Sequence, residues 1–115
     1  MFSSNNQIEI FKKIESEHYL PKLIEQLNKD FQLANIDSEF GSELLITEVN
    51  EQLNKLIYKL ITTQYDDYLN LLYRIDVSEK ELALVTGVDL KENIREISFL
   101  IIKREFQKVW FKSKI

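Results

Sequence analysis

The sequence predicts an all-α fold, a compact bundle of four main helices with one or two short helices. Its apolar residues recur at intervals of three and four almost throughout, which is the period of a helix with one buried face. The 115 residues include only two Gly and one Pro, too few for the many turns of a β protein. The length and the 44% hydrophobic content fit a single helical domain, residues 1–115.

The first two predicted helices have recognisable start signals. Ser4, followed three residues later by Gln7, forms a capping box that opens a short helix. The apolar side of this helix consists of Ile8, Phe11 and Ile14. Pro21 fits the first turn of a second helix, which the turn residues 35–38 and Gly41 end. The apolar stripe of the second helix consists of Leu20, Leu23, Ile24, Leu27, Phe31 and Ala34.

The third predicted helix has the most regular pattern. Its apolar residues keep a 3-4-3-4 spacing, which favours near-parallel neighbours as in a four-helix bundle. They are Ile46, Val49, Leu53, Leu56 and Leu60, with Leu45, Ile57 and Ile61 widening the face. After a connection at residues 62–64, a fourth helix has the stripe Tyr65, Tyr68, Leu69, Leu72, Tyr73 and Ile75. Orthogonal connectivity stays open, because the segments around Val77 and Gly87 can turn the chain sharply.

Two more helices are predicted near the end of the sequence. A capping box at Ser78 opens a short helix that reaches about Val85, and Gly87 ends it in the left-handed conformation. Asp89 caps the last and longest helix. Its two adjoining stripes are Leu90, Ile94, Ile97 and Ile101, and Phe99, Ile102, Phe106 and Val109. Since more than half of its circumference is apolar, this helix is expected at the centre of the bundle or in an oligomer interface.

The scarce residues exclude several classes of function. Without Cys there is no disulfide scaffold, thiolate metal site or cysteine nucleophile. One His, His18, excludes a site built on a pair of histidines, and we expect it to be a surface or capping residue. With two Gly there is no glycine-rich phosphate loop. We therefore expect no enzyme activity, no metal and no cofactor.

The charge is distributed unevenly along the chain. Residues 103–115 carry five Lys or Arg and one Glu, a local charge of +4. Because the net charge of the whole chain is −4, the first 102 residues carry a net charge of −8. Large aromatic residues alternate with these cations, a pattern that favours contact with a partner. The predicted partner-binding residues are Lys103, Arg104, Phe106, Trp110 and Phe111. Two alternatives stay open: Trp110 belongs to the core, or residues 103–114 contact an anionic membrane surface.

These observations predict a non-enzymatic protein–protein interaction module that self-associates as a homodimer through its long last helix. The first residues lack the features of a secretory signal, and apolar runs reach only four residues, as at Phe99–Ile102. We therefore expect a cytoplasmic protein without a membrane span. Abundant Lys, Ile and Asn favour an A/T-rich bacterial genome as its source.

A DNA-binding regulator is the alternative function, because residues 79–97 resemble a helix-turn-helix. Ala83 and Gly87 lie four apart, as the small residue and the glycine do in that motif. Glu92 and Glu96 in the would-be recognition helix, and the acidic body, oppose contact with nucleic acid. A third hypothesis, a ligand site in the bundle core, requires a polar cluster that faces inward.

Overall fold

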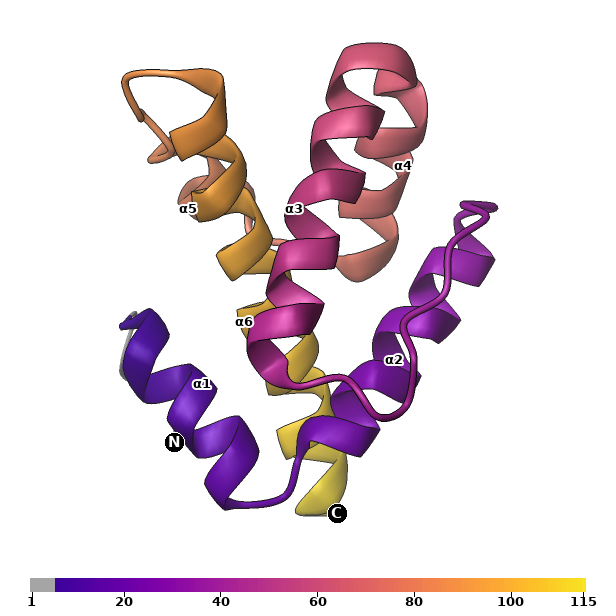
Figure 1. Cartoon of the computed structure of the whole chain (residues 1–115), viewed down its shortest axis with the longest axis vertical. Coiled ribbons are helices and arrows are strands. Elements are labelled where there is room, and N and C mark those ends of the chain that lie inside the picture. Colours follow the sequence, from indigo (N-terminus) through magenta and orange to yellow (C-terminus); the bar gives the residue numbers. More distant parts are fainter. Residues whose placement is uncertain (1–5) are drawn as a thin grey trace.

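The structure describes residues 6–115 (Figure 1). This part of the chain forms six α-helices and contains no β-strand. This computed structural model confirms the predicted all-α bundle. The helices are α1 (Gln7–Ser16), α2 (Leu20–Leu33), α3 (Ile46–Thr63), α4 (Tyr65–Ile75), α5 (Glu79–Ala83) and α6 (Leu90–Ser113). Helices α2, α3, α4 and α6 are the four main ones, and α1 and α5 are the two short ones.

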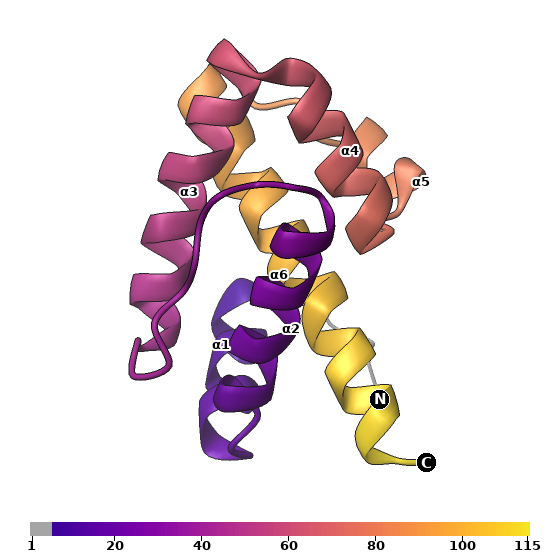
Figure 2. The same cartoon turned by 90° about the vertical axis from the view of Figure 1, so that its right-hand side faces the viewer.

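Helix α6 occupies the centre of the bundle and packs against all five other helices (Figures 1 and 2). Its 24 residues rise by about 36 Å at 1.5 Å per residue. The longest dimension of the domain is 36 Å, so the two ends of α6 lie at opposite ends of the molecule. Helices on several sides cover α6, which explains why apolar residues occupy more than half of its circumference. Of the two predicted positions, the centre of the bundle is the one observed.

The core consists largely of the predicted stripes of α2, α3 and α6. Their fully buried apolar members include Leu23, Leu27, Phe31, Val49, Leu53, Ile57, Ile101, Ile102 and Phe106. Leu45 differs from the prediction and is 56% exposed, because it precedes the first turn of α3 in an extended conformation. In α1 the buried side is formed by Ile10, Phe11 and Ile14, while Ile8 points outward.

The buried face of α4 is rotated relative to the prediction. It consists of Tyr68, Leu71, Leu72 and Ile75. Tyr65, Leu69 and Tyr73, which were expected in the stripe, are exposed. Tyrosine is a weak guide to burial, because its hydroxyl group is readily solvated while its ring covers neighbouring apolar surface.

Most predicted helix starts are present. Ser78 and Asp89 each accept a hydrogen bond from the backbone N–H three residues later, over 3.3 and 2.8 Å. Pro21 lies in the first turn of α2. The predicted cap Ser4 lies outside the described residues, and the side chain of Asn6 caps α1 by accepting two backbone N–H hydrogen bonds. These contacts satisfy N–H groups that have no partner within the helix.

Three helices end at a residue with positive φ, and none of these residues is glycine. His18, Asn35 and Asp76 have φ of 61°, 58° and 68°. The prediction that Gly41 and Gly87 end helices is therefore wrong, because α2 and α5 end several residues earlier and neither glycine has positive φ. His, Asn and Asp are the side chains that enter the left-handed region most readily after glycine, so the sequence needs few glycines.

Gly87 lies very close to side chains in the first turn of α6. A Cβ atom at this position would lie 2.5 Å from Asn93 Oδ1 and 3.0 Å from Glu92 Cγ. The backbone before α6 therefore passes against the first turn of that helix at a distance that only glycine permits without a shift of these side chains.

Replacing His18 with glycine is expected to stabilise the domain. The His18 N–H donates to Glu15 O and the Tyr19 N–H donates to Ile14 O, a Schellman ending that fixes His18 in the left-handed region. Glycine removes the steric cost of that conformation, so His18→Gly should raise the free energy of unfolding by about 0.5–1 kcal/mol in urea denaturation. The control Ser16→Gly, inside α1, should lower it by a similar amount. A loss of stability in His18→Gly would contradict this account.

Candidate functional site

Two of the predicted partner-binding cations form ion pairs with acidic residues of the same domain. Lys103 is only 7% exposed, and its Nζ lies 2.7 Å from Oε2 of Glu81 on α5. Arg104 donates from Nε to the backbone oxygen of Asp76 over 3.0 Å and from Nη2 to its Oδ2 over 3.2 Å. The acidic body therefore pairs with these two cations, and they do not contribute unpaired positive charge to the basic end of the sequence.

The predicted aromatic residues occupy different environments. Phe106 is fully buried, with its ring centroid 5.2 Å from that of Tyr19, so it is a core residue and cannot contact a partner in the folded domain. Trp110 is half-buried and Phe111 is 49% exposed, with ring centroids 5.1 Å apart. Lys114 Nζ lies 5.1 Å from the centroid of the Trp110 ring. We call Trp110, Phe111 and Lys114 the C-terminal aromatic cluster.

The segment that resembles a helix-turn-helix has a long connection. Helix α5 contains five residues, and six residues, 84–89, separate it from α6. The turn of a helix-turn-helix has three or four residues. The exposed first turns of α6 carry Glu92 and Glu96 beside Lys91 and Arg95, so no excess of positive charge faces outward there. DNA binding stays a prediction to which this geometry adds no support.

A buried polar network connects α2 and α6, and the sequence prediction did not include it. Glu105 is fully buried, and Asp30 and Gln26 are 4% and 9% exposed. Together with Lys108 and Lys112 they form what we call the α2–α6 polar network. Because burying a charge without a partner is costly, the contacts among these five residues determine whether the cluster is tolerated.

The five side chains form a chain of contacts. Lys112 Nζ donates to Gln26 Oε1 over 2.8 Å, and Gln26 Nε2 donates to Asp30 Oδ2 over 3.1 Å. The same Asp30 oxygen accepts from Lys108 Nζ over 2.7 Å. Lys108 Nζ also lies 2.7 Å from Glu105 Oε1, an ion-pair contact without hydrogen-bond alignment. Every member of the network thus has a polar neighbour.

The pKa values of the two carboxyl groups in the network are shifted in opposite directions. Burial, together with the hydrogen bond to Asp30, raises the pKa of Glu105 to about 9, although Lys108 acts in the opposite direction. Burial alone would raise the pKa of Asp30, but hydrogen bonds with Glu105, Lys108 and Gln26 outweigh it and hold this pKa below 3.8. At neutral pH Glu105 is therefore protonated and Asp30 is ionised, with Lys108 as the counterion.

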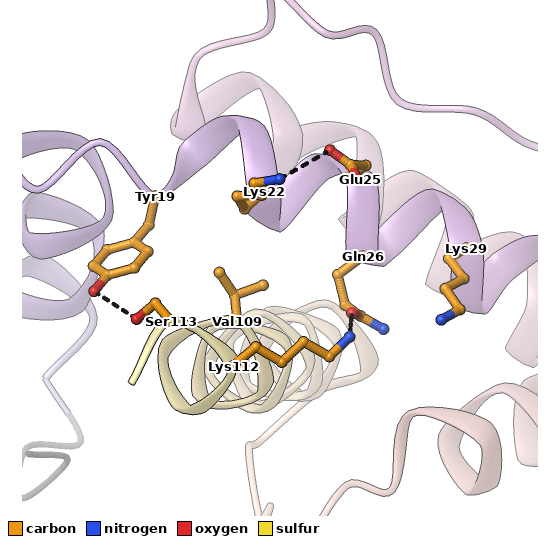
Figure 3. A pocket seen from close by; sticks show the side chains of 8 residues that line it. All are labelled: Tyr19, Lys22, Glu25, Gln26, Lys29, Val109, Lys112 and Ser113. Atoms are coloured by element: carbon orange, nitrogen blue, oxygen red, sulfur yellow. Dashed lines mark hydrogen bonds and ion pairs between the residues drawn. The ribbon is translucent and has the colours of Figure 1, made fainter. Parts of the chain in front are cut away.

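A pocket opens at the outer end of this network, between α2 and α6 (Figure 3). Its volume is about 370 Å³. The lining residues are Tyr19, Lys22, Glu25, Gln26, Lys29, Val109, Lys112 and Ser113. Figure 3 shows the hydrogen bond from Lys112 to Gln26 at one side of the pocket and the contact of Tyr19 with Ser113 at the other. Gln26 and Lys112 thus belong both to the pocket and to the buried network.

A groove lies near the other end of α6, and we call it the α5–α6 groove. Its volume is about 560 Å³. Its lining residues are Gln7, Glu81, Leu84, Val85, Glu92, Arg95, Glu96, Phe99 and Leu100. Leu84 is 76% exposed and the nearby Val88 is 95% exposed. The groove therefore combines apolar side chains with three glutamates and one arginine.

Comparison with models of known protein families, with curated proteins and with solved structures finds no match. In the part of the chain that the structure describes, no helix is both long enough and apolar enough to cross a membrane. The functional proposals below therefore rest on the residues of this chain alone.

Proposed function

We propose that this chain is a non-enzymatic helical interaction module that self-associates. In this proposal the C-terminal aromatic cluster of one copy docks into the α5–α6 groove of a second copy. The observation that supports it best is the placement of two complementary surfaces at opposite ends of the same helix, α6.

The geometry of α6 requires the contact to be intermolecular. Leu100 in the groove and Phe111 in the cluster are eleven residues apart on one continuous helix, which places them about 16 Å apart along its axis. A rigid helix cannot bring its own two ends together, so the two surfaces of one chain never meet. A two-fold axis between two copies would let each cluster enter the other copy's groove and close the assembly as a dimer.

The two surfaces are complementary in charge and polarity. The groove carries three glutamates and one arginine, and since Lys103 pairs with Glu81, the remaining net charge is −1. The cluster lies beside Lys112 and contains Lys114, and residues 106–115 include no acidic residue. Phe111 supplies an exposed aromatic side chain for the apolar floor formed by Leu84, Phe99 and their neighbours. Such a pair of surfaces favours association through aromatic anchors with steering by charge.

Substitutions on the two surfaces test this proposal. Phe111→Glu and Leu84→Glu each place a carboxylate in the proposed interface, so each should weaken dimerisation at least about tenfold. The measurement is sedimentation velocity over a range of micromolar concentrations. The control Tyr73→Glu changes a side chain on α4 that is 85% exposed and lies outside both surfaces, and it should leave dimerisation unchanged.

A mixing experiment makes this test specific to the groove and the cluster. The Leu84→Glu protein retains a normal cluster, and the Phe111→Glu protein retains a normal groove. An equimolar mixture should therefore regain association through one intact contact, although each variant alone is monomeric. A wild-type protein that remains strictly monomeric would overturn the proposal, and so would dimerisation that neither substitution weakens.

A further inference from the structure

The pocket between α2 and α6 gathers positive charge from two helices that are far apart in sequence. Lys22 and Lys29 come from α2, and Lys112 comes from α6 (Figure 3). Glu25 is the only acidic residue that lines the pocket, so the lining carries a net charge of +2. We propose that this pocket binds a phosphate group, carried by a small phosphorylated molecule or by the headgroup of an anionic lipid.

The positive charge of the pocket is not neutralised by its own surroundings. Lys22 Nζ lies 4.0 Å from Glu25 Oε2, and both side chains are more than 70% exposed, so solvent screens this pair strongly. Lys112 donates to the neutral amide of Gln26 and keeps its full charge. An incoming anion can therefore interact with three ammonium groups, the compact cations with which lysine binds phosphate.

A buried polar side chain anchors one wall of the pocket. Gln26 is nine-tenths buried, and it is held in place by Lys112 on one side of its amide and by Asp30 on the other. Asp30 uses one hydrogen of the Gln26 NH₂ group, and an amide of this kind has a second hydrogen to donate. The α2–α6 polar network thus fixes both Gln26 and Lys112, which lowers the entropy lost when a ligand binds.

Hydroxyl groups and an apolar surface complete the pocket. Tyr19 OH and Ser113 Oγ lie 3.2 Å apart at one end, and the buried Val109 lies beside Ser113 (Figure 3). A volume of about 370 Å³ lies in the range of small-molecule sites. The pocket adjoins both the start of α2 and the end of α6, whose helix dipoles act on an anion in opposite directions. The three lysines therefore determine the preference for an anion.

The first experiment titrates the isotope-labelled protein with inorganic phosphate at constant ionic strength and follows its NMR spectrum, with chloride as the reference anion. Phosphate should produce saturable shifts at the backbone amides of Lys29, Val109 and Lys112 and at the side-chain amide of Gln26. Saturation with phosphate does not report on self-association, so this result is independent of the proposed dimer. Shifts that are no larger or more localised than those with chloride would count against the site.

Charge-reversal variants identify the lysines responsible. The double variant Lys22→Glu/Lys29→Glu should weaken phosphate binding about tenfold or more, because both exposed side chains face the pocket and neither belongs to the core. The matched control Lys12→Glu/Lys59→Glu makes the same change in net charge at exposed lysines outside the pocket. Equal weakening in both variants would show a general charge effect and overturn the proposal.

Vesicle sedimentation then identifies the source of the phosphate group. Phosphatidylcholine vesicles with and without phosphatidic acid, which presents a phosphate monoester, serve as probes. Binding that requires phosphatidic acid and is lost in Lys22→Glu/Lys29→Glu would assign the pocket to a lipid headgroup. Saturable phosphate binding without vesicle binding would assign it to a small phosphorylated molecule. Failure of both probes would overturn the proposal.

Discussion

Raising the pH is expected to destabilise the domain steeply, because Glu105 must lose a proton in the core. Between its ordinary value of 4.5 and about 9, the folded chain keeps the Glu105 proton and the unfolded chain has released it. The unfolded state then binds fewer protons, so the contribution of Glu105 to the free energy of unfolding falls by about 1.4 kcal/mol per pH unit. This contribution is complete below 4.5 and is lost above about 9.

The variant Glu105→Gln should remove this dependence. The glutamine amide has the shape of a protonated carboxyl group and can donate to Asp30 without titrating. Urea denaturation at a series of pH values should therefore show a much smaller slope, and Glu105→Gln should be more stable than the wild type near the alkaline end. Glu96→Gln, which removes an exposed carboxyl group from the same helix, is the control and should keep the wild-type slope. A wild-type protein whose stability is flat from pH 5 to pH 9 would contradict a protonated Glu105.

Asp30 adds a dependence of the opposite sign at acid pH. Its pKa lies below 3.8 in the folded domain, so its stabilising contribution is present above that value and is lost as the pH falls through the folded pKa. From these two groups alone, stability is greatest in mildly acidic solution.

Two phenylalanines five residues apart on α6 are expected to behave in opposite ways. Phe106 is fully buried against Tyr19, so Phe106→Ala leaves a cavity and should lower the free energy of unfolding by about 3–5 kcal/mol. Phe111 is 49% exposed, so Phe111→Ala should change this free energy by no more than about 0.5 kcal/mol. Guanidinium denaturation measures both values.

Comparing Phe106→Ala with Phe111→Ala also distinguishes an effect on folding from an effect on association. We expect Phe111→Ala to retain the wild-type stability of the monomer while it weakens dimerisation. If Phe111→Ala instead costs as much stability as Phe106→Ala, Phe111 belongs to the core and the proposed contact surface is wrong. Sedimentation velocity on the folded Phe111→Ala protein distinguishes these outcomes.

The fold was predictable because the helical period determines which faces are buried. The stripes of α2 and α3 follow from apolar spacing alone, and the wide apolar surface of α6 made the centre of the bundle one of its two expected positions. Predictions failed where the same local sequence pattern is compatible with more than one structure. Gly87 lies against side chains in the first turn of α6 and has no positive φ, and Leu45 continues the apolar spacing although it precedes the helix.

Long-range contacts could not be predicted in the same way. Phe40 lies in the connection between α2 and α3, yet it is almost fully buried, with its ring centroid 5.4 Å from that of Phe31. Asn28 hydrogen-bonds to both the N–H and the C=O of Phe40. Nothing local in the sequence marks this pairing. Similarly, the contact between Asp30 and Lys108 joins residues 78 positions apart.

The buried acids nevertheless left a signal in the sequence. Asp30 continues the spacing of Leu23, Leu27 and Ala34, and Glu105 continues that of Ile94, Ser98 and Ile101. A carboxylate on the buried stripe of a helix indicates a paired charge or a raised pKa. Examining apolar stripes for such interruptions would have identified both residues, although not the fact that they meet.

The central position of α6 also has a consequence for biosynthesis. A ribosome releases the chain from its N-terminus, so α1 to α5 emerge before the helix against which all of them pack. The surfaces that these helices bury against α6 remain uncovered until residues 90–113 have been translated. The domain therefore completes its core only after most of it has been synthesised, and the apolar surface that is exposed during that interval favours aggregation.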